Sequence, residues 1–187
     1  MKALIIVDMQ NDFINEALGT PEAQAIVPNV IEKLKQHENT ETVVFFTKDT
    51  HYENYLETPE GKKLPVPHCI KGTEGWSIQK DIAAEFKVGA YIGYSSEDVI
   101  NSRILKETFG SYDLVNILKT TEAWDEIELC GVCTDICVIS NALLVKNAFP
   151  NIPVIVDASC CAGVTPEKHA AALEVMKSCQ IEVVGEQ

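Results

Sequence analysis

Cys137 is the residue of this sequence whose type and position could do the clearest chemistry. It closes the run CGVCTDIC, residues 130–137, in which an apolar strand meets a glycine and a helix then begins. The first turn of a helix presents unpaired N–H groups and partial positive charge, which favour a thiolate and offer donors to an oxyanion. Thr134 is suited to cap that helix. Cys137 is therefore a candidate nucleophile, although a single cysteine is more commonly a small buried residue.

Two charged residues elsewhere in the chain could assist this thiol. Asp8 follows the apolar run 3–7, which puts a carboxylate at the carboxyl end of a strand, where open α/β sheets bind ligands. Taken alone, Asp8 could equally join a solvated turn. Lys106 follows a weaker predicted strand, and most lysines are solvated. An ammonium between Asp8 and Cys137 would nevertheless hold both as anions or ease proton exchange between them.

A second group of polar residues suits a metal ion. Asp49 and His51 follow the apolar run 42–47, and Glu60 and His68 lie in the long connection after it. Mixed nitrogen and oxygen ligands are typical of catalytic divalent metal sites, for which we expect zinc, with iron or manganese as alternatives. Each histidine alone would more commonly be a surface residue. Glu57 is an alternative to Glu60 as the carboxylate.

The cysteines must also be weighed as metal ligands. Cys130, Cys133 and Cys137 form the pattern C-x2-C-x3-C, but three thiols would need a fourth ligand. Cys130 falls inside the predicted strand, whereas cluster ligands usually come from loops. The odd total of seven cysteines, with no secretory signal, favours reduced thiols over disulfides. The nucleophile interpretation is therefore preferred to an iron–sulfur or zinc cluster.

Composition limits the classes of partner. With 187 residues, 46% hydrophobic and 23% charged, the chain should form a single soluble domain, residues 1–187. A net charge of −13 argues against nucleic acid and anionic membranes and favours a neutral or small polar substrate. The apolar run at the start is too short for a signal or a membrane span, so we expect a cytoplasmic protein.

Alternating apolar runs and helical patterns predict the α/β class with a parallel sheet of five or six strands. The predicted strands are residues 3–7, 42–47, 127–131, 153–156 and 181–184, with a weaker one at 98–104. The predicted helices are residues 22–37, 78–86, 112–119, 134–148 and 166–178, the last capped by Thr165 with Pro166 at its first position. Residues 50–76 show neither period, and a loop of that length is commonly functional.

With these positions assembled, the sequence resembles the isochorismatase-like cysteine hydrolases, and within them the nicotinamidases. The run DMQNDF at residues 8–13 is similar to the family's D-x-Q-x-D-F, and residues 49–51 resemble its D-x-H element. Residues 131–138, GVCTDICV, resemble the G-V-x-T-D-x-C-V signature, and Lys106 occupies the position of the family lysine. The order and intervals are kept from residue 3 to about residue 165, with the last motif the most specific.

The resemblance implies a Rossmann-like three-layer sandwich with a six-stranded parallel sheet. It also implies a catalytic triad and a non-proline cis peptide between Val132 and Cys133, with the backbone N–H groups of Cys133 and Cys137 as the oxyanion hole. The triad would be Asp8, Lys106 and Cys137, and the metal would be held by Asp49, His51 and His68 with Glu60 as a ligating or neighbouring carboxylate.

The activity implied is hydrolysis of nicotinamide to nicotinate and ammonia through a thioester, a step of pyridine nucleotide salvage, by a homo-oligomer. Phe13 and Trp76 are candidate walls for the ring, although either aromatic is more commonly core. The segment 109–112, FGSY, lacks the family's S-A-F ending, which leaves substrate size open.

Three alternatives therefore stay open. One is hydrolysis of another small carboxamide or carbamoyl compound, and another is isochorismatase-type vinyl-ether hydrolysis, which does not require the thiol. The third, from a different class, is a non-catalytic binding or thiol-redox protein that uses the same fold.

Overall fold

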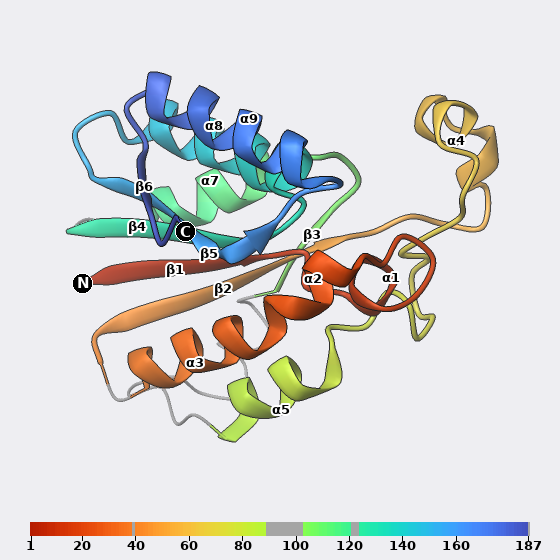
Figure 1. Ribbon diagram of the computed structural model, residues 1–187, viewed down its shortest axis with the longest axis horizontal. Helices are drawn as coiled ribbons and strands as arrows, with labels where there is room; N and C mark the ends of the chain where they lie inside the picture. Colours follow the sequence, from red (N-terminus) through yellow and green to blue (C-terminus); the bar gives the residue numbers. More distant parts are fainter. Residues whose placement is uncertain (39, 89–102, 121–123, 187) are drawn as a thin grey trace.

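The predicted α/β architecture is confirmed by the computed structural model, which describes residues 1–38, 40–88, 103–120 and 124–186 (Figure 1). Six parallel strands form one sheet in the order β3-β2-β1-β4-β5-β6. The strands are β1 (Lys2–Val7), β2 (Thr42–Asp49), β3 (Arg103–Lys106), β4 (Glu126–Val132), β5 (Val154–Ala162) and β6 (Glu182–Val184). Of the weaker predicted strand, residues 98–102 lie outside the described part of the chain.

Helices cover both faces of this sheet (Figure 1). On one face lie α3 (Val27–His37) and α5 (Lys80–Val88), and on the other lie α7 (Tyr112–Lys119), α8 (Ile139–Ala148) and α9 (Pro166–Ser178). The central strands β1 and β4 are almost wholly buried. Continuous apolar runs such as residues 3–7 are expected of parallel strands covered on both sides.

Local hydrogen bonds explain where several helices begin. α7 and α9 have the predicted bounds, and Thr165 caps α9 as expected, because its Oγ1 accepts from the backbone N–H of Lys168 at 3.3 Å. α5 begins at Lys80 rather than at Ile78, since Gln79 Oε1 accepts from the N–H groups of the first turn.

Two predictions about segments before the third strand were wrong in detail. Residues 22–37 form two helices, α2 (Pro21–Ala25) and α3, because Pro28 has no N–H and its ring would clash with the carbonyl four residues earlier. The predicted loop 50–76 holds a 3-10 turn (Tyr55–Glu57) and α4 (Pro59–Lys63). α4 extends away from the sheet in Figure 1.

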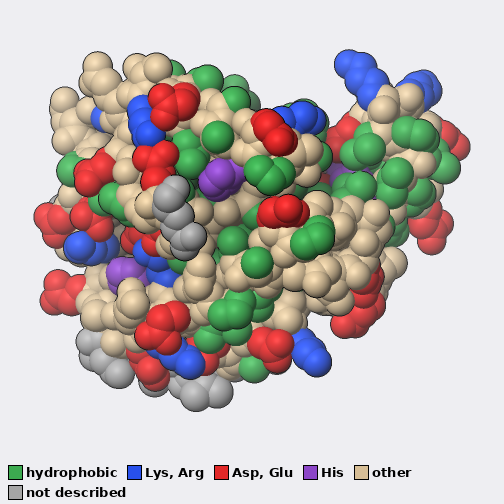
Figure 2. All heavy atoms as spheres, in the orientation of Figure 1, with side chains coloured by type: hydrophobic (Ala, Val, Ile, Leu, Met, Phe, Trp, Pro, Cys, Tyr) green, Lys and Arg blue, Asp and Glu red, His purple; other side chains and the backbone are tan. Residues whose placement is uncertain are grey.

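The described part of the chain holds no helix that is both long and apolar enough to cross a bilayer. Acidic side chains are spread over the face drawn in Figure 2, as expected from the net charge of −13.

Gly131 lies where β4 passes closest to β1. Its φ is +122°, and a Cβ added there would lie 2.1 Å from the carbonyl oxygen of Val7. Only glycine avoids both the unfavourable φ and the collision with backbone, so this residue sets the spacing of the two central strands beside Asp8.

We expect Gly131→Ala to lower the free energy of unfolding by more than about 3 kcal/mol, because β1 cannot move without disrupting the sheet. Gly72→Ala is the matched control: Gly72 also has positive φ, +88°, but its added Cβ would meet nothing within 4 Å. The control should cost only about 1–2 kcal/mol. Urea unfolding of both variants measures the difference, and equal losses would contradict the close approach.

Candidate active site and metal centre

The candidate catalytic residues meet at the carboxyl ends of neighbouring strands. Asp8 follows β1, Asp49 and Lys106 are the last residues of β2 and β3, and Cys137 follows β4. Asp49 and Lys106 are also paired in the register of β2 and β3. Since the carboxyl ends of parallel strands share one edge of the sheet, residues far apart in sequence come together there.

Lys106 lies at the centre of this group. Its Nζ is 2.6 Å from Asp8 Oδ2, 3.3 Å from Asp49 Oδ1 and 3.5 Å from Cys137 Sγ. All four side chains are buried. The structure therefore brings the predicted triad together and joins it to the first of the predicted metal ligands.

The proton affinities of the triad depend on this burial. Burial raises the pKa of Asp8, and the charge of Lys106 opposes the rise only in part. Burial also raises the pKa of the Cys137 thiol well above its ordinary range, and the charge of Asp8 adds to the effect. The pKa of Lys106 would fall through burial, but Asp8, Cys137 and Asp49 raise it overall.

The expectation that the helix start would favour a thiolate is therefore wrong for the resting site. Burial, and after it the charge of Asp8, raise the pKa of Cys137 above its ordinary value, which favours the thiol in the resting site. The carboxyl of Asp8 accepts a hydrogen bond from Thr47 Oγ1 at 2.7 Å on Oδ1. Its Oδ2 is paired with the Lys106 ammonium, 2.6 Å away, and receives no hydrogen bond from any other described residue.

Cys137 sits in a turn of unusual form. The peptide bond between Val132 and Cys133 is cis, as the resemblance implied. Residues Thr134–Val138, the nucleophile turn, form one π-helical turn in which the Val138 N–H donates to the Cys133 carbonyl at 3.0 Å. α8 begins only after it, so the predicted helix 134–148 has two parts.

Thr134 does not cap this turn. Cys133 occupies the cap position without a side-chain hydrogen bond, and the buried hydroxyl of Thr134 is hydrogen-bonded to His169 Nδ1 at 2.8 Å. Helix-capping propensity could not predict this hydrogen bond, because the partner of Thr134 lies in α9, more than thirty residues later in the chain.

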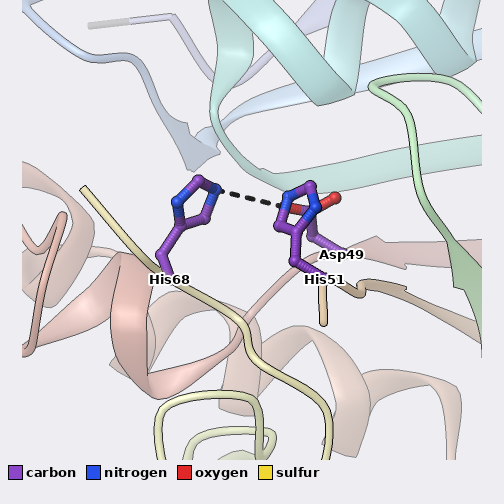
Figure 3. A group of neighbouring side chains, drawn as sticks. All are labelled: Asp49, His51 and His68. Atoms are coloured by element: carbon purple, nitrogen blue, oxygen red, sulfur yellow. Dashed lines mark hydrogen bonds and ion pairs between the residues drawn. The ribbon is translucent and has the colours of Figure 1, made fainter. Parts of the chain in front are cut away.

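Asp49, His51 and His68 form the metal-ligand group expected from the sequence (Figure 3). Each offers one ligand atom, and these atoms all lie within 4.8 Å of one another. Asp49 Oδ2 is 3.0 Å from His51 Nε2 and 3.4 Å from His68 Nε2. This is the sole cluster of three or more such ligands among residues that the structure describes, and it contains no cysteine.

The protonation of these ligands suits a cation. His68 Nδ1 lies 2.8 Å from the carbonyl oxygen of Val66, which can only accept, so Nδ1 donates and Nε2 is the ring nitrogen that faces Asp49. Burial would lower the pKa of His68, but its hydrogen bonds and the charges of Asp49 and Glu60 raise it overall, so a bound cation would take the place of a proton on Nε2. Burial would raise the pKa of Asp49, but His51, His68 and Lys106 lower it overall and keep this carboxylate ionised. A divalent metal therefore fits the donor set that these residues present.

Glu60 is the fourth candidate ligand and the second carboxylate near this group. Its Oε1 is 3.8 Å from His51 Nε2 and 4.0 Å from His68 Nε2. Glu57, the alternative considered from the sequence, is exposed on the 3-10 turn before α4. Tyr55 packs against both imidazoles, with ring centroids 4.7 and 5.0 Å away.

A cavity of about 290 Å³ connects the two groups. Its lining includes the candidate metal residues Asp49, Glu60 and His68, together with Cys133, Cys137 and Phe13. A hollow between the α4 lobe and the rest of the molecule is visible in Figure 2, with hydrophobic side chains beside it.

Trp76 does not line this cavity, which corrects its assignment as a wall. Its indole N–H donates to Thr50 Oγ1 at 3.0 Å, and Lys48 Nζ lies 3.0 Å from its ring centroid. These contacts hold the indole ring against Lys48 and Thr50, outside the cavity lining. Leu64, Phe109 and Val164 line the cavity instead, all partly exposed. Of these, Phe109 alone had a sequence signal, because it lies where the family pattern is broken.

The family model described as "Isochorismatase domain" matches residues 2–187. The nicotinamidase/pyrazinamidase of Mycobacterium tuberculosis is 33% identical over 199 residues, with 98% of each chain covered.

Solved structures agree in fold. The nicotinamidase/pyrazinamidase of Bacillus subtilis has a TM-score of 0.81 at 27% identity, with 98% of each chain covered. The pyrazinamidase of Pyrococcus horikoshii, solved in complex with zinc, has a TM-score of 0.75 at 26% identity, with 99% of each chain covered. With a family model that spans nearly the whole sequence, this chain belongs to the isochorismatase family of hydrolases.

Proposed function

We propose that this chain is a cysteine amidohydrolase that converts nicotinamide to nicotinate and ammonia through a thioester. The observation that carries the proposal is the contact of one buried ammonium, Lys106 Nζ, with both Asp8 and Cys137 Sγ. A thiol, a carboxyl and a cation in contact supply a nucleophile, a proton carrier and charge balance. The relatives named as nicotinamidases support the amide as the bond that is broken.

The reaction proceeds in two halves. Asp8 takes the proton of Cys137 as the sulfur attacks the carboxamide carbon, and Lys106 balances the negative charges. Asp8 then gives the proton to the nitrogen, the C–N bond breaks and ammonia leaves. Water attacks the thioester with Asp8 as the base, which releases the carboxylic acid and restores the thiol.

The carbonyl oxygen gains negative charge in both halves. The backbone N–H groups of Cys133 and Cys137 are the proposed donors to that oxygen. Both residues line the cavity, and hydrogen-bond donors that are fixed before the reaction commonly contribute a factor of about 10²–10³.

Asp49, His51 and His68 would hold a divalent metal, with Glu60 as a nearby carboxylate, and we propose zinc. When bound, the ion supplies Lewis acidity for a lone-pair donor such as a pyridine nitrogen. The chain's own contribution is to keep Asp49 ionised between this group and Lys106.

The cavity favours a small ring over a large ligand. Its volume of about 290 Å³ lies at the lower end of the range for ligand pockets. Phe13 lines it beside His68, with ring centroids 5.5 Å apart, and can pack against an aromatic substrate. Vinyl-ether hydrolysis is less well supported, because it would leave the buried thiol and its base without a role.

We expect Cys137→Ala to lower ammonia release from nicotinamide at least about a thousandfold, because the nucleophile is gone. Cys179→Ser is the matched control, since Cys179 is exposed at the end of α9 and should not affect the rate. Both variants should keep the wild-type melting temperature within a few degrees. A Cys137→Ala variant with wild-type turnover would contradict covalent catalysis. Reversible oxidation of Cys137, with no turnover of any amide by wild type, would favour the redox alternative.

Asp8→Asn should separate the role of Asp8 as a base from the effect of its charge on the pKa of Cys137. The charge of Asp8 raises the pKa of Cys137, so its removal should lower that pKa and let iodoacetamide modify Cys137 at lower pH. Turnover should nevertheless fall at least about a hundredfold, because no carboxylate is left to carry the proton. Alkylation followed by mass spectrometry and ammonia release measure the two effects. Retained turnover would exclude Asp8 as the base.

Glu60→Gln should weaken zinc binding by about tenfold to a hundredfold, because a carboxylate beside two imidazoles is lost. Glu57→Gln is the matched control, one turn away and exposed. Zinc content after dialysis against a graded chelator, measured by mass spectrometry, gives the affinities. Equal affinity in both variants would remove Glu60 from the site. Full amidase activity after verified loss of metal from wild type would remove the metal from the reaction.

A further inference from the structure

His169 is tied directly to the turn that carries the nucleophile. Its Nδ1 lies 2.8 Å from the hydroxyl of Thr134, the first residue of the nucleophile turn. Thr134 is fully buried, and this is the one hydrogen bond that its hydroxyl makes within the described ranges. His169 lies in the first turns of α9, an element that supplies no member of the proposed triad or metal group.

A second contact ties the same two segments together. Asp135 Oδ1, in the nucleophile turn, accepts from the backbone N–H of Val164 at 2.9 Å. Gly163 is packed so closely between them that an added Cβ would lie 2.9 Å from Asp135 Oδ1 and from His169 Cβ. The start of α9 and the nucleophile turn are therefore held at a fixed distance by side-chain contacts.

The imidazole of His169 faces a second cavity on its other side. This groove, about 510 Å³, is lined by residues of α2, α3, β5 and α9 and by residues 185 and 186, and it includes Ser159, Leu173 and Glu174. The active-site cavity is lined by the residue next to His169, Lys168, and by Val164. His169 thus separates the groove from the catalytic turn, in contact with the turn but not with the substrate cavity.

We propose that His169 is a positioning residue, which through Thr134 holds the Cys133 peptide, one of the two proposed oxyanion donors, in place. The inference rests on the amidase function proposed above. Thr134 directly follows Cys133, so a shift of Thr134 turns the peptide that joins them and, through the Cys133 Cα, the preceding Val132–Cys133 peptide, which carries the donor N–H. A buried hydroxyl that loses its partner is unfavourable, and the turn relaxes to find another. The donors then no longer meet the developing oxyanion at the best distance.

The first test compares variants of α9. His169→Ala should lower kcat for nicotinamide about tenfold, with KM changed less than about twofold, because a donor is misplaced in the transition state rather than lost from substrate binding. His169→Asn should recover most of the rate, since its amide offers both a donor and an acceptor near the place of Nδ1. Glu174→Ala is the matched control, on the same helix and the same groove but outside the turn. It should leave kcat unchanged.

The second test is a double-mutant cycle with Thr134→Val, which removes the hydroxyl but keeps the shape. If the two side chains act through one hydrogen bond, the double variant should be no slower than the slower single variant. Affinity for pyridine-3-carbaldehyde, whose hemithioacetal with Cys137 puts an oxygen in the oxyanion position, should fall with His169→Ala by about the same factor as kcat.

The outcomes are distinguishable. Wild type without amide turnover would contradict the proposed function, and the inference with it. An active wild type, together with a folded His169→Ala variant of unchanged kcat and aldehyde affinity, would contradict the inference alone. A rise in KM without loss of kcat, a slow His169→Asn variant, or additive effects in the cycle would also overturn it. If His169→Ala does not fold, kcat, KM and aldehyde affinity are measured on Thr134→Val and His169→Asn instead. A folded Thr134→Val variant with unchanged kcat and aldehyde affinity, or a slow His169→Asn variant, would then contradict the inference.

Discussion

The buried ammonium of Lys106 is the interaction on which the rest of the site depends. An ammonium removed from water is costly unless anions surround it, and Lys106 is met by Asp8 on one side and by Asp49 on another. The same charge faces the sulfur of Cys137. The proposed nucleophile, the proposed base and a candidate metal ligand are thereby parts of one electrostatic group. A change in the charge of any one of them alters the proton affinity of the others.

In the proposed mechanism, this group allows Cys137 to act as a nucleophile although its pKa is raised. Burial suppresses the thiolate of Cys137, which protects the resting thiol. It also increases the proton affinity of Asp8, whose Oδ2 is paired with the Lys106 ammonium. A carboxyl group with a raised pKa is a better acceptor for the thiol proton than an exposed carboxylate, so in the proposed mechanism the proton moves as the sulfur attacks rather than before it. The ordered backbone around Gly131 keeps that arrangement close-packed.

The contribution of the fold is to bring the candidate site residues together at one edge of the sheet. Parallel strands end at one edge of the sheet, so the residues that follow β1, β2, β3 and β4 converge whatever their separation in sequence. The segment with α4 closes the metal side, because Tyr55 packs on both imidazoles and Glu60 approaches them. α9 supports the other side through His169. The nucleophile turn is thus held from two directions.

The sequence by itself determined what is local. Residue types, the order of motifs, the cap at Thr165 and the buried parallel strands follow from patterns within a few residues, and so do the side chains that could react. Only tertiary structure decided the rest, since burial and partners come from distant segments. It raised the pKa of Cys137 instead of lowering it, put Glu60 rather than Glu57 beside the histidines, moved Trp76 away from the cavity and gave Thr134 a partner in α9. Desolvation and long-range contacts depend on residues that are distant in the chain, so no short stretch of sequence indicates them. For this reason the sequence determined the local features and the tertiary structure decided the others.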